Sequence, residues 1–122
     1  MYQFVIPIHH VNWSTRSVLE GISQKYKPKQ IYVVTSDHEI KIFKDKSNSW
    51  DIENLTLLDE DNFFLNKYGL TKKDIVSQIT QNKPNYSPGW LYQQIIKLGA
   101  SDIIDELDDV FLIWDADLLP VR

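Results

Sequence analysis

The sequence contains no cysteine, which excludes a disulfide-stapled scaffold and a cysteine-ligated zinc site. No apolar run approaches the roughly 20 residues that span a bilayer, so no transmembrane segment is expected. The first residues lack the basic and apolar regions of a signal peptide. These absences favour a cytoplasmic location. The remaining composition, 43% hydrophobic and 25% charged in 122 residues, is that of a single globular domain.

The sequence also has fewer basic than acidic residues. The chain has 13 basic and 17 acidic residues, a formal net charge of −4, so non-specific binding to nucleic acid is not expected. The acidic residues are concentrated near the end, because residues 101–122 hold seven acids and a single base, Arg122. An acidic concentration of this kind suits a cation.

Several well-known catalytic and cofactor motifs are missing. There is no G-x-G-x-x-G and no Walker loop, so binding of NAD or ATP in those modes lacks support. Nucleophilic catalysis is not indicated either. The chain has no cysteine and no G-x-S-x-G, and Ser36 has no evident His/Asp pairing in the sequence.

Short apolar runs alternate with helical patterns along the chain, which predicts an α/β fold with a doubly wound, Rossmann-like and mostly parallel sheet. The expected strands are residues 2–8, 30–35, 40–43, 55–58 and 110–114, the last of them central. The expected helices are residues 12–24, a segment from residues 59–61 through Leu65 with Gly69 just beyond it, a helix capped by Thr71 and Asp74, residues 90–98 ended by Gly99, and a short acidic helix from Ser101 to about Leu107.

In such sheets ligands bind beyond the carboxyl ends of the strands. Asp115 and Asp117 follow the most apolar predicted strand directly, and residues two apart in an extended segment point to the same side. Two adjacent carboxylates repel each other, and a hard divalent cation such as Mn²⁺ or Mg²⁺ relieves that repulsion. The sequence therefore predicts a metal site at Asp115 and Asp117. An acidic turn without a ligand is the alternative.

The helix predicted over residues 90–98 is the second candidate site. Its spacing puts Gln93, Gln94 and Lys97 on one side, with Leu91, Ile95 and Leu98 directed to the core. The polar side can face a ligand, with Lys97 beside a phosphate or sugar hydroxyl. A solvated helix face is the competing interpretation. Trp90 stands either at the rim of the site or as a staple at the start of the helix.

Other candidates follow the first two predicted strands. His9 can contact a ligand, although adjacent histidines point apart and His9 and His10 are not expected to chelate a metal. Thr35 ends the second strand and Asp37 follows it, where Asp37 can hydrogen-bond a base or ribose or simply cap a turn.

The ordered segments resemble a known group. They are V-I-P-I at residues 5–8 with R-S-V-L-E at residues 16–20, I-Y-V-V-T at residues 31–35, the G-W-L-Y-Q-Q-I-I-K-L run at residues 89–98, and F-L-I-W-D-A-D at residues 111–117. Together they look like the nucleotide-binding half of GT-A glycosyltransferases, specifically a subgroup with a G-W-x-x-Q-Q-x-x-K-L segment before a D-x-D strand.

The resemblance implies binding of a nucleoside-diphosphate sugar. Asp117 would be a metal ligand, Asp115 would serve the metal or the ribose, and the loops after Ile8 and Thr35 would hold the nucleoside. The acceptor is unknown. Enzymes of this kind continue well past the D-x-D strand, so we expect a fragment, an interrupted reading frame or a donor half completed by another chain. A non-catalytic sugar-nucleotide module and a plain α/β interaction domain are the alternatives.

Overall fold

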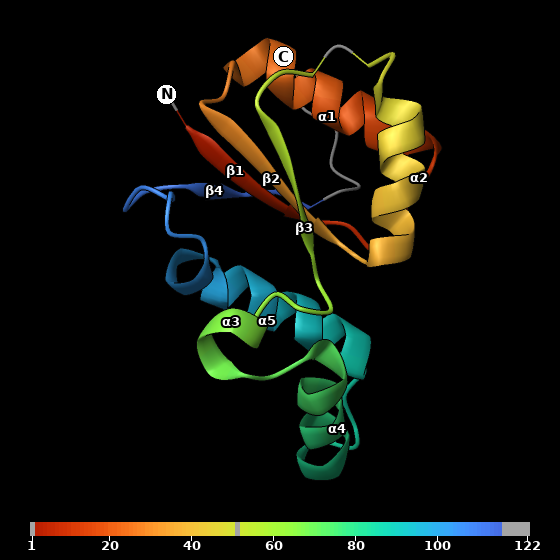
Figure 1. Ribbon diagram of the computed structural model, residues 1–122, viewed down its shortest axis with the longest axis vertical. Helices are drawn as coiled ribbons and strands as arrows, with labels where there is room; N and C mark the ends of the chain where they lie inside the picture. The colour runs from red at the N-terminus through yellow and green to blue at the C-terminus, as the bar shows by residue number, and fades with distance from the viewer. Residues whose placement is uncertain (1, 51, 116–122) are drawn as a thin grey trace.

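A computed structural model describes residues 2–50 and 52–115, without the side chain of Trp13. The elements in chain order are β1 (Gln3–Pro7), α1 (Trp13–Tyr26), β2 (Gln30–Thr35), α2 (Asp37–Ser47), β3 (Leu55–Asp59), α3 (Leu65–Tyr68), α4 (Lys72–Asn82), α5 (Pro88–Ile103) and β4 (Leu112–Ile113). Figure 1 shows α1 and α2 on one side of the sheet and α5 with α3 on the other. The α/β prediction is confirmed.

The strands of the described residues form one sheet in the order β3-β2-β1-β4, and every pairing is parallel. This order is compatible with a Rossmann-like fold, because the chain extends the sheet from β1 first in one direction and then in the other. All five residues of β1 are buried, as expected for an inner strand covered on both faces.

Side chains that alternate along the strands build two cores. Phe4, Ile6, Ile31 and Val33 meet α1 and α2 on one face, while Val5, Tyr32 and Val34 meet α5 on the other. Each strand therefore needs apolar residues at almost every position. The near-continuous apolar runs of the sequence have this cause.

The prediction that residues 110–114 form a central strand was wrong for the described residues. Only Leu112–Ile113 pair with the sheet, and they do so at the edge beside β1. Residues 110–114 are apolar because their side chains pack on both faces of the sheet. Trp114 joins the core beneath α1, and Phe111 joins the core beneath α5.

The predicted strand at residues 40–43 was also wrong, because these residues belong to α2. Ser36 caps that helix by accepting a hydrogen bond from the Glu39 backbone N–H, and Ile40 and Phe43 are the buried side. Their spacing of three fits a helix face, whereas the apolar-polar alternation over four residues only imitates a strand.

Helix start signals were predicted well. Asn12 caps α1, and the capping box of Thr71 and Asp74 begins α4 as expected. The helix expected from residue 59 is instead a turn followed by the short α3, with Gly69 in the left-handed conformation that ends it.

Helix α5 differs most from expectation. It continues through Gly99 and Ser101, so neither residue ends or caps a helix, and no separate acidic helix follows within the described residues. A Cβ added at Gly99 would lie 2.8 Å from Cε1 of Phe64, so the glycine admits a ring from the neighbouring segment. The buried positions are Tyr92, Ile96 and Ala100, and Leu98 is 84% exposed.

None of the helices in the described residues combines the length and apolar character needed to cross a membrane.

Candidate functional site

A pocket of about 510 Å³ lies at the carboxyl ends of β1 and β4. The strand order reverses at this point, with β2 on one side of β1 and β4 on the other. Parallel α/β sheets bind ligands at such a switch point, because the loops after the two strands diverge and leave a crevice. The pocket is the candidate site.

Four parts of the fold line the pocket. The loop after β1 contributes Pro7 to His10 and Asn12, and the first turn of α1 contributes Ser14 and Thr15. Helix α5 contributes Trp90, Gln93, Gln94 and Lys97, which share one side of the helix at helical spacing. Asp115 enters from the segment after β4. The first turn of α1 thus faces this space, and the N-terminal turn of a helix favours anions.

Lys97 and Asp115 form an ion pair across the pocket. Lys97 Nζ lies 2.8 Å from Asp115 Oδ1, and the lysine side chain is the more buried of the two, with 20% exposed against 54% for the aspartate. The pair joins α5 to the segment after β4. Because Asp115 is open to solvent, a ligand can reach the ion pair and replace either partner with a stronger one.

Glu39 of α2 anchors the loop that carries the two histidines. Its carboxylate is nearly buried, pairs through Oε1 with His10 Nδ1 at 3.0 Å, and accepts a hydrogen bond from the Val11 backbone N–H at 3.1 Å. The bond with His10, followed by the bond from Val11, lowers the pKa of Glu39 below its ordinary value. Sequence reasoning missed this residue because an acid in the first turn of a helix normally indicates only a capping role.

Glu39→Gln should destabilise the protein at neutral pH by about 1.5 kcal/mol, the size of one charge-assisted hydrogen bond. A carboxyl group whose pKa is lowered in the folded state stabilises the fold above its unfolded pKa, and this contribution is lost as the pH falls through the folded pKa. The difference between wild type and variant should therefore shrink below about pH 4. Urea unfolding at several pH values measures it.

Asp37→Asn is the matched control for this prediction, because Asp37 lies on the same helix but is exposed and forms a surface ion pair with Lys41 at 3.3 Å. Its effect should stay within about 0.5 kcal/mol. An equal loss in both variants would contradict the anchoring role of Glu39.

The structure brings five of the predicted site residues together. His9, Trp90, Gln94, Lys97 and Asp115 line the one pocket. Asp117 lies outside the described residues. Asn12, Ser14 and Thr15 were not predicted to face a ligand, since their sequence signal is helix capping.

Two predicted residues lie apart from the pocket lining. Thr35 is fully buried at the end of β2, and its hydroxyl has no hydrogen-bond partner among the described residues. Asp37 begins α2 on the exposed surface. Their predicted roles in holding a nucleoside remain predictions.

The described residues supply few metal ligands. No group of three or more His, Asp or Glu side chains converges within residues 2–50 and 52–115. Asp115 is the only carboxylate lining the described part of the pocket. Mg²⁺ uses one or two protein carboxylates together with water and substrate phosphates, so Asp115 fits as one member of such a set.

The acidic run at the end of β3 has a structural role instead. Asp59 accepts hydrogen bonds from the Asp61 backbone N–H and the Asn62 amide. Glu60 is buried, and this burial raises its pKa despite Lys72 at 3.6 Å. Neither side chain lines the pocket at β1 and β4.

Comparison with known proteins adds a family. No curated protein and no solved structure matches the chain. A family profile described as "Family of unknown function (DUF6492)" matches residues 16–122. The match takes in the α5 side of the pocket and Asp115, and leaves out β1 and His9. Because it covers most of the sequence, the chain belongs to the DUF6492 family.

Proposed function

We propose that this protein is the donor-binding unit of a GT-A-type glycosyltransferase and that its pocket binds a nucleoside-diphosphate sugar. The observation that carries the proposal is the convergence of Trp90, Gln94, Lys97 and Asp115 at the switch point between β1 and β4. These residues come from two segments of the chain and meet where an α/β sheet binds nucleotides.

The lining suits each part of such a ligand. Lys97 and the first turn of α1 attract the negative diphosphate. The amides of Gln93 and Gln94 can both donate and accept hydrogen bonds, as sugar hydroxyls require. The Trp90 side chain is 54% exposed at the rim, where its ring offers a flat apolar surface to a sugar or a base.

A divalent cation completes the proposal. Asp115 and Asp117 would hold Mn²⁺ or Mg²⁺, which neutralises the diphosphate and stabilises the charge on the departing nucleoside diphosphate. The Lys97–Asp115 pair keeps both side chains in position before binding. On binding, Lys97 would turn to a phosphate oxygen and Asp115 to the cation.

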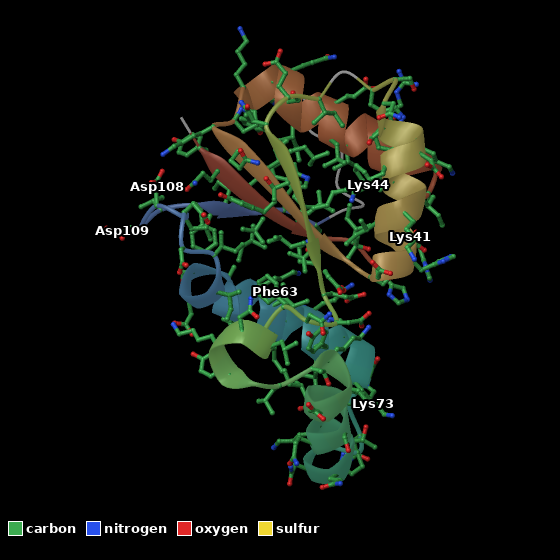
Figure 2. The ribbon with its side chains drawn as sticks, viewed as in Figure 1. Lys41, Lys44, Phe63, Lys73, Asp108 and Asp109 are labelled. Atoms are coloured by element: carbon green, nitrogen blue, oxygen red, sulfur yellow. The ribbon has the colours of Figure 1, made fainter. Side chains whose placement is uncertain are left out.

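Calorimetric titration with UDP- and GDP-sugars, with and without Mn²⁺, tests the proposal. Lys97→Met should weaken binding at least about tenfold, the value of one lost charge-assisted contact. Lys41→Met is the matched control, because Lys41 is an exposed lysine on the outer side of α2 (Figure 2) and its loss should change binding less than about twofold.

The metal is tested separately. Asp115→Asn and Asp117→Ala should remove the Mn²⁺ dependence of binding while the protein still folds, since a strand-end carboxylate contributes little packing. If no sugar nucleotide binds in the presence of Mn²⁺, the donor-binding proposal is wrong. If Asp117→Ala binds as the wild type does, the metal assignment is wrong.

A non-catalytic sugar-nucleotide module is the second candidate. One observation favours it: Asp115, the sole carboxylate of the described lining, is already paired with Lys97, so no free carboxylate base faces the pocket from the described residues. Chromatography of the bound donor after incubation separates the two. Release of free sugar or transfer to an acceptor supports the enzyme, and an intact donor supports the module.

A further inference from the structure

Strand β3 forms one edge of the sheet, and its outer side pairs with no strand of the described residues. The Ile31 N–H donates a hydrogen bond to the Asn54 carbonyl, so the backbone of residue 54 faces β2. Successive residues of a strand direct their N–H and C=O groups to opposite sides. The backbone groups of Leu55, Leu57 and Asp59 therefore face outward, as an open row of donors and acceptors.

Proteins usually protect such an edge, but β3 lacks the common protective devices. Its sequence, L-T-L-L-D, contains neither lysine nor proline, and all five residues pair with β2 in an unbroken register without a bulge. Every residue of β3 is half-buried, whereas β1 and nearly all of β2 are buried. An edge of this kind accepts an additional strand from another chain.

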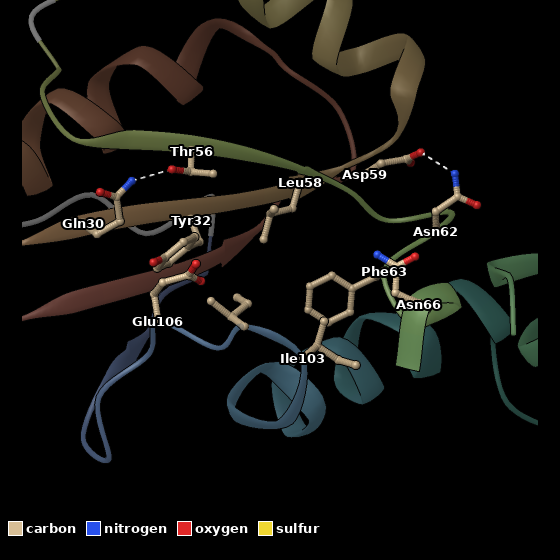
Figure 3. Close-up of a pocket in the computed structure, with 11 residues that line it drawn as sticks. Gln30, Tyr32, Thr56, Leu58, Asp59, Asn62, Phe63, Asn66, Ile103 and Glu106 are labelled. Carbon is tan, nitrogen blue, oxygen red and sulfur yellow. Dashed lines mark hydrogen bonds between the residues drawn. The ribbon is translucent and has the colours of Figure 1, made fainter. Parts of the chain in front are cut away.

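A pocket of about 550 Å³ adjoins this edge on the face of the sheet that packs against α5 (Figure 3). Thr56 and Leu58 of β3 form part of its wall, and Phe63 and Ile103 line it from the segments that pack over the sheet. A strand added to β3 would lie about 4.8 Å away and direct alternate side chains to this face. One of these side chains can enter the pocket, whose lining suits an apolar group.

The sequence around β3 is acidic. Residues 51–66 hold five acids and no base, whereas the rest of the chain holds 12 acids and 13 bases. Lys72 pairs with Glu60, but neither Glu53 before the strand nor Asp61 after it has an ion-pair partner among the described residues. Unpaired negative charge thus stands beyond both ends of the open edge, and this charge favours a basic partner.

A second copy of this chain does not suit the edge. Antiparallel pairing of two β3 strands about Leu57 would bring Glu53 of one copy opposite Asp61 of the other, and two-fold symmetry would repeat this contact. Like charges directly opposite each other destabilise a pair of strands. A strand with basic ends forms two attractive contacts at the same positions.

We propose that β3 binds an extended, basic segment of a partner protein as an additional strand of the sheet. The outward backbone groups of β3 supply the main-chain hydrogen bonds. Glu53 and Asp61 attract basic side chains at the two ends, and the pocket beside Leu58 receives one apolar side chain between them. The inference does not depend on the proposed function, because this pocket shares no lining residue with the pocket at β1 and β4.

Synthetic peptides test the proposal with the intact protein. The nonapeptides KKTVXVTKK, in which X is valine, leucine or tyrosine, combine a strand-forming centre with basic ends. We expect saturable one-to-one binding of at least one of them in calorimetric titration at low salt. A counterpart with glutamate in place of lysine, and another N-methylated at its three central residues, should each bind at least about tenfold more weakly. Equal affinity of either counterpart would overturn the assignment, and so would the absence of saturable binding by all three basic peptides.

Amide hydrogen exchange followed by NMR locates the bound peptide. The outward amides of Leu55, Leu57 and Asp59 should exchange quickly in the free protein and at least about tenfold more slowly with saturating peptide. The amides of Thr56 and Leu58 face β2 and should change less, so they serve as internal controls. Protection of Leu57 in the free protein would show that another segment or a second copy already holds the edge, and it would overturn the proposal.

Variants separate a defined site from general attraction to an acidic protein. Glu53→Gln combined with Asp61→Asn should weaken binding of the basic peptide about fivefold at low salt. The fold should persist, since neither carboxylate accepts a hydrogen bond from the described residues. Asp45→Asn combined with Asp109→Asn removes equal charge from exposed positions away from β3 (Figure 2 labels Asp109). It should change binding less than about twofold. Equal weakening by both double variants would mean diffuse attraction and would overturn the site.

Discussion

Replacement of Tyr92 by alanine is expected to lower the free energy of unfolding by about 3–5 kcal/mol, the range for deleting a large buried aromatic side chain. Tyr92 is the largest fully buried side chain among the described residues, and its ring packs against Phe64 at a centroid distance of 6.2 Å. Its hydroxyl also donates a hydrogen bond to the backbone carbonyl of Glu60. The residue therefore ties α5 to the segment after β3.

Tyr92→Phe separates the two contributions. It keeps the ring and removes only the bond to Glu60, so it should destabilise by about 1 kcal/mol. Guanidinium chloride unfolding followed by tryptophan fluorescence measures both variants. A loss in Tyr92→Phe as large as that in Tyr92→Ala would show that the hydrogen bond, not the packing, dominates at this position.

Ile96→Ala and Leu98→Ala are expected to differ sharply although the two residues lie two positions apart on α5. Ile96 is fully buried and Leu98 is 84% exposed. Ile96→Ala should therefore lower the free energy of unfolding by about 2–5 kcal/mol, through lost burial and the cavity that remains. Leu98→Ala should change it by no more than about 0.5 kcal/mol.

Guanidinium chloride unfolding also measures the free energy of unfolding of these two variants, and each variant serves as the control for the other. A large loss at Leu98 with little effect at Ile96 would mean that α5 presents the opposite side to the sheet. That result would also turn Gln93, Gln94 and Lys97 away from the pocket at β1 and β4, because their direction follows from the same rotation of the helix.

The sequence alone does not determine which side of α5 is buried. Leu91, Tyr92, Ile95, Ile96 and Leu98 spread over nearly half of the helix circumference, so the centre of the apolar stripe can be placed at more than one position. The buried side is decided by Ala100 and Gly99, which are small enough for the Phe64 ring to approach. That ring comes from a separate segment, and one helix pattern carries no information about it.

Strand prediction succeeded where burial on both faces of the sheet alone determines the sequence pattern. Residues 30–35 form β2 as expected, because an inner parallel strand needs apolar side chains on both faces. Residues 40–43 have both an alternating and a helical pattern, and the cap supplied by Ser36 decides for the helix. Such a choice between two patterns depends on context outside the run itself.

Much of the candidate site could be anticipated, because the rule on strand ends depends on topology alone. It directed attention to His9 and Asp115, which do line one pocket. The helix spacing likewise put Gln94 and Lys97 on one side. Glu39 could not be foreseen, because its contact with His10 joins residues 29 positions apart. The Lys97–Asp115 ion pair could not be predicted either, because it depends on how α5 packs against the sheet.

The pairing of Phe4 with Leu112 has a consequence for how the molecule assembles. The first strand must wait for nearly the whole described chain to be synthesised before its second neighbour arrives. Contacts between such distant residues are slow to form, because a long loop has to close first. We expect amide hydrogens of β1 and β2 to exchange slowly with solvent, and those of residues 112–114 to exchange sooner through local opening. Among the described residues, the candidate pocket beside Asp115 would then be the last part to form during folding.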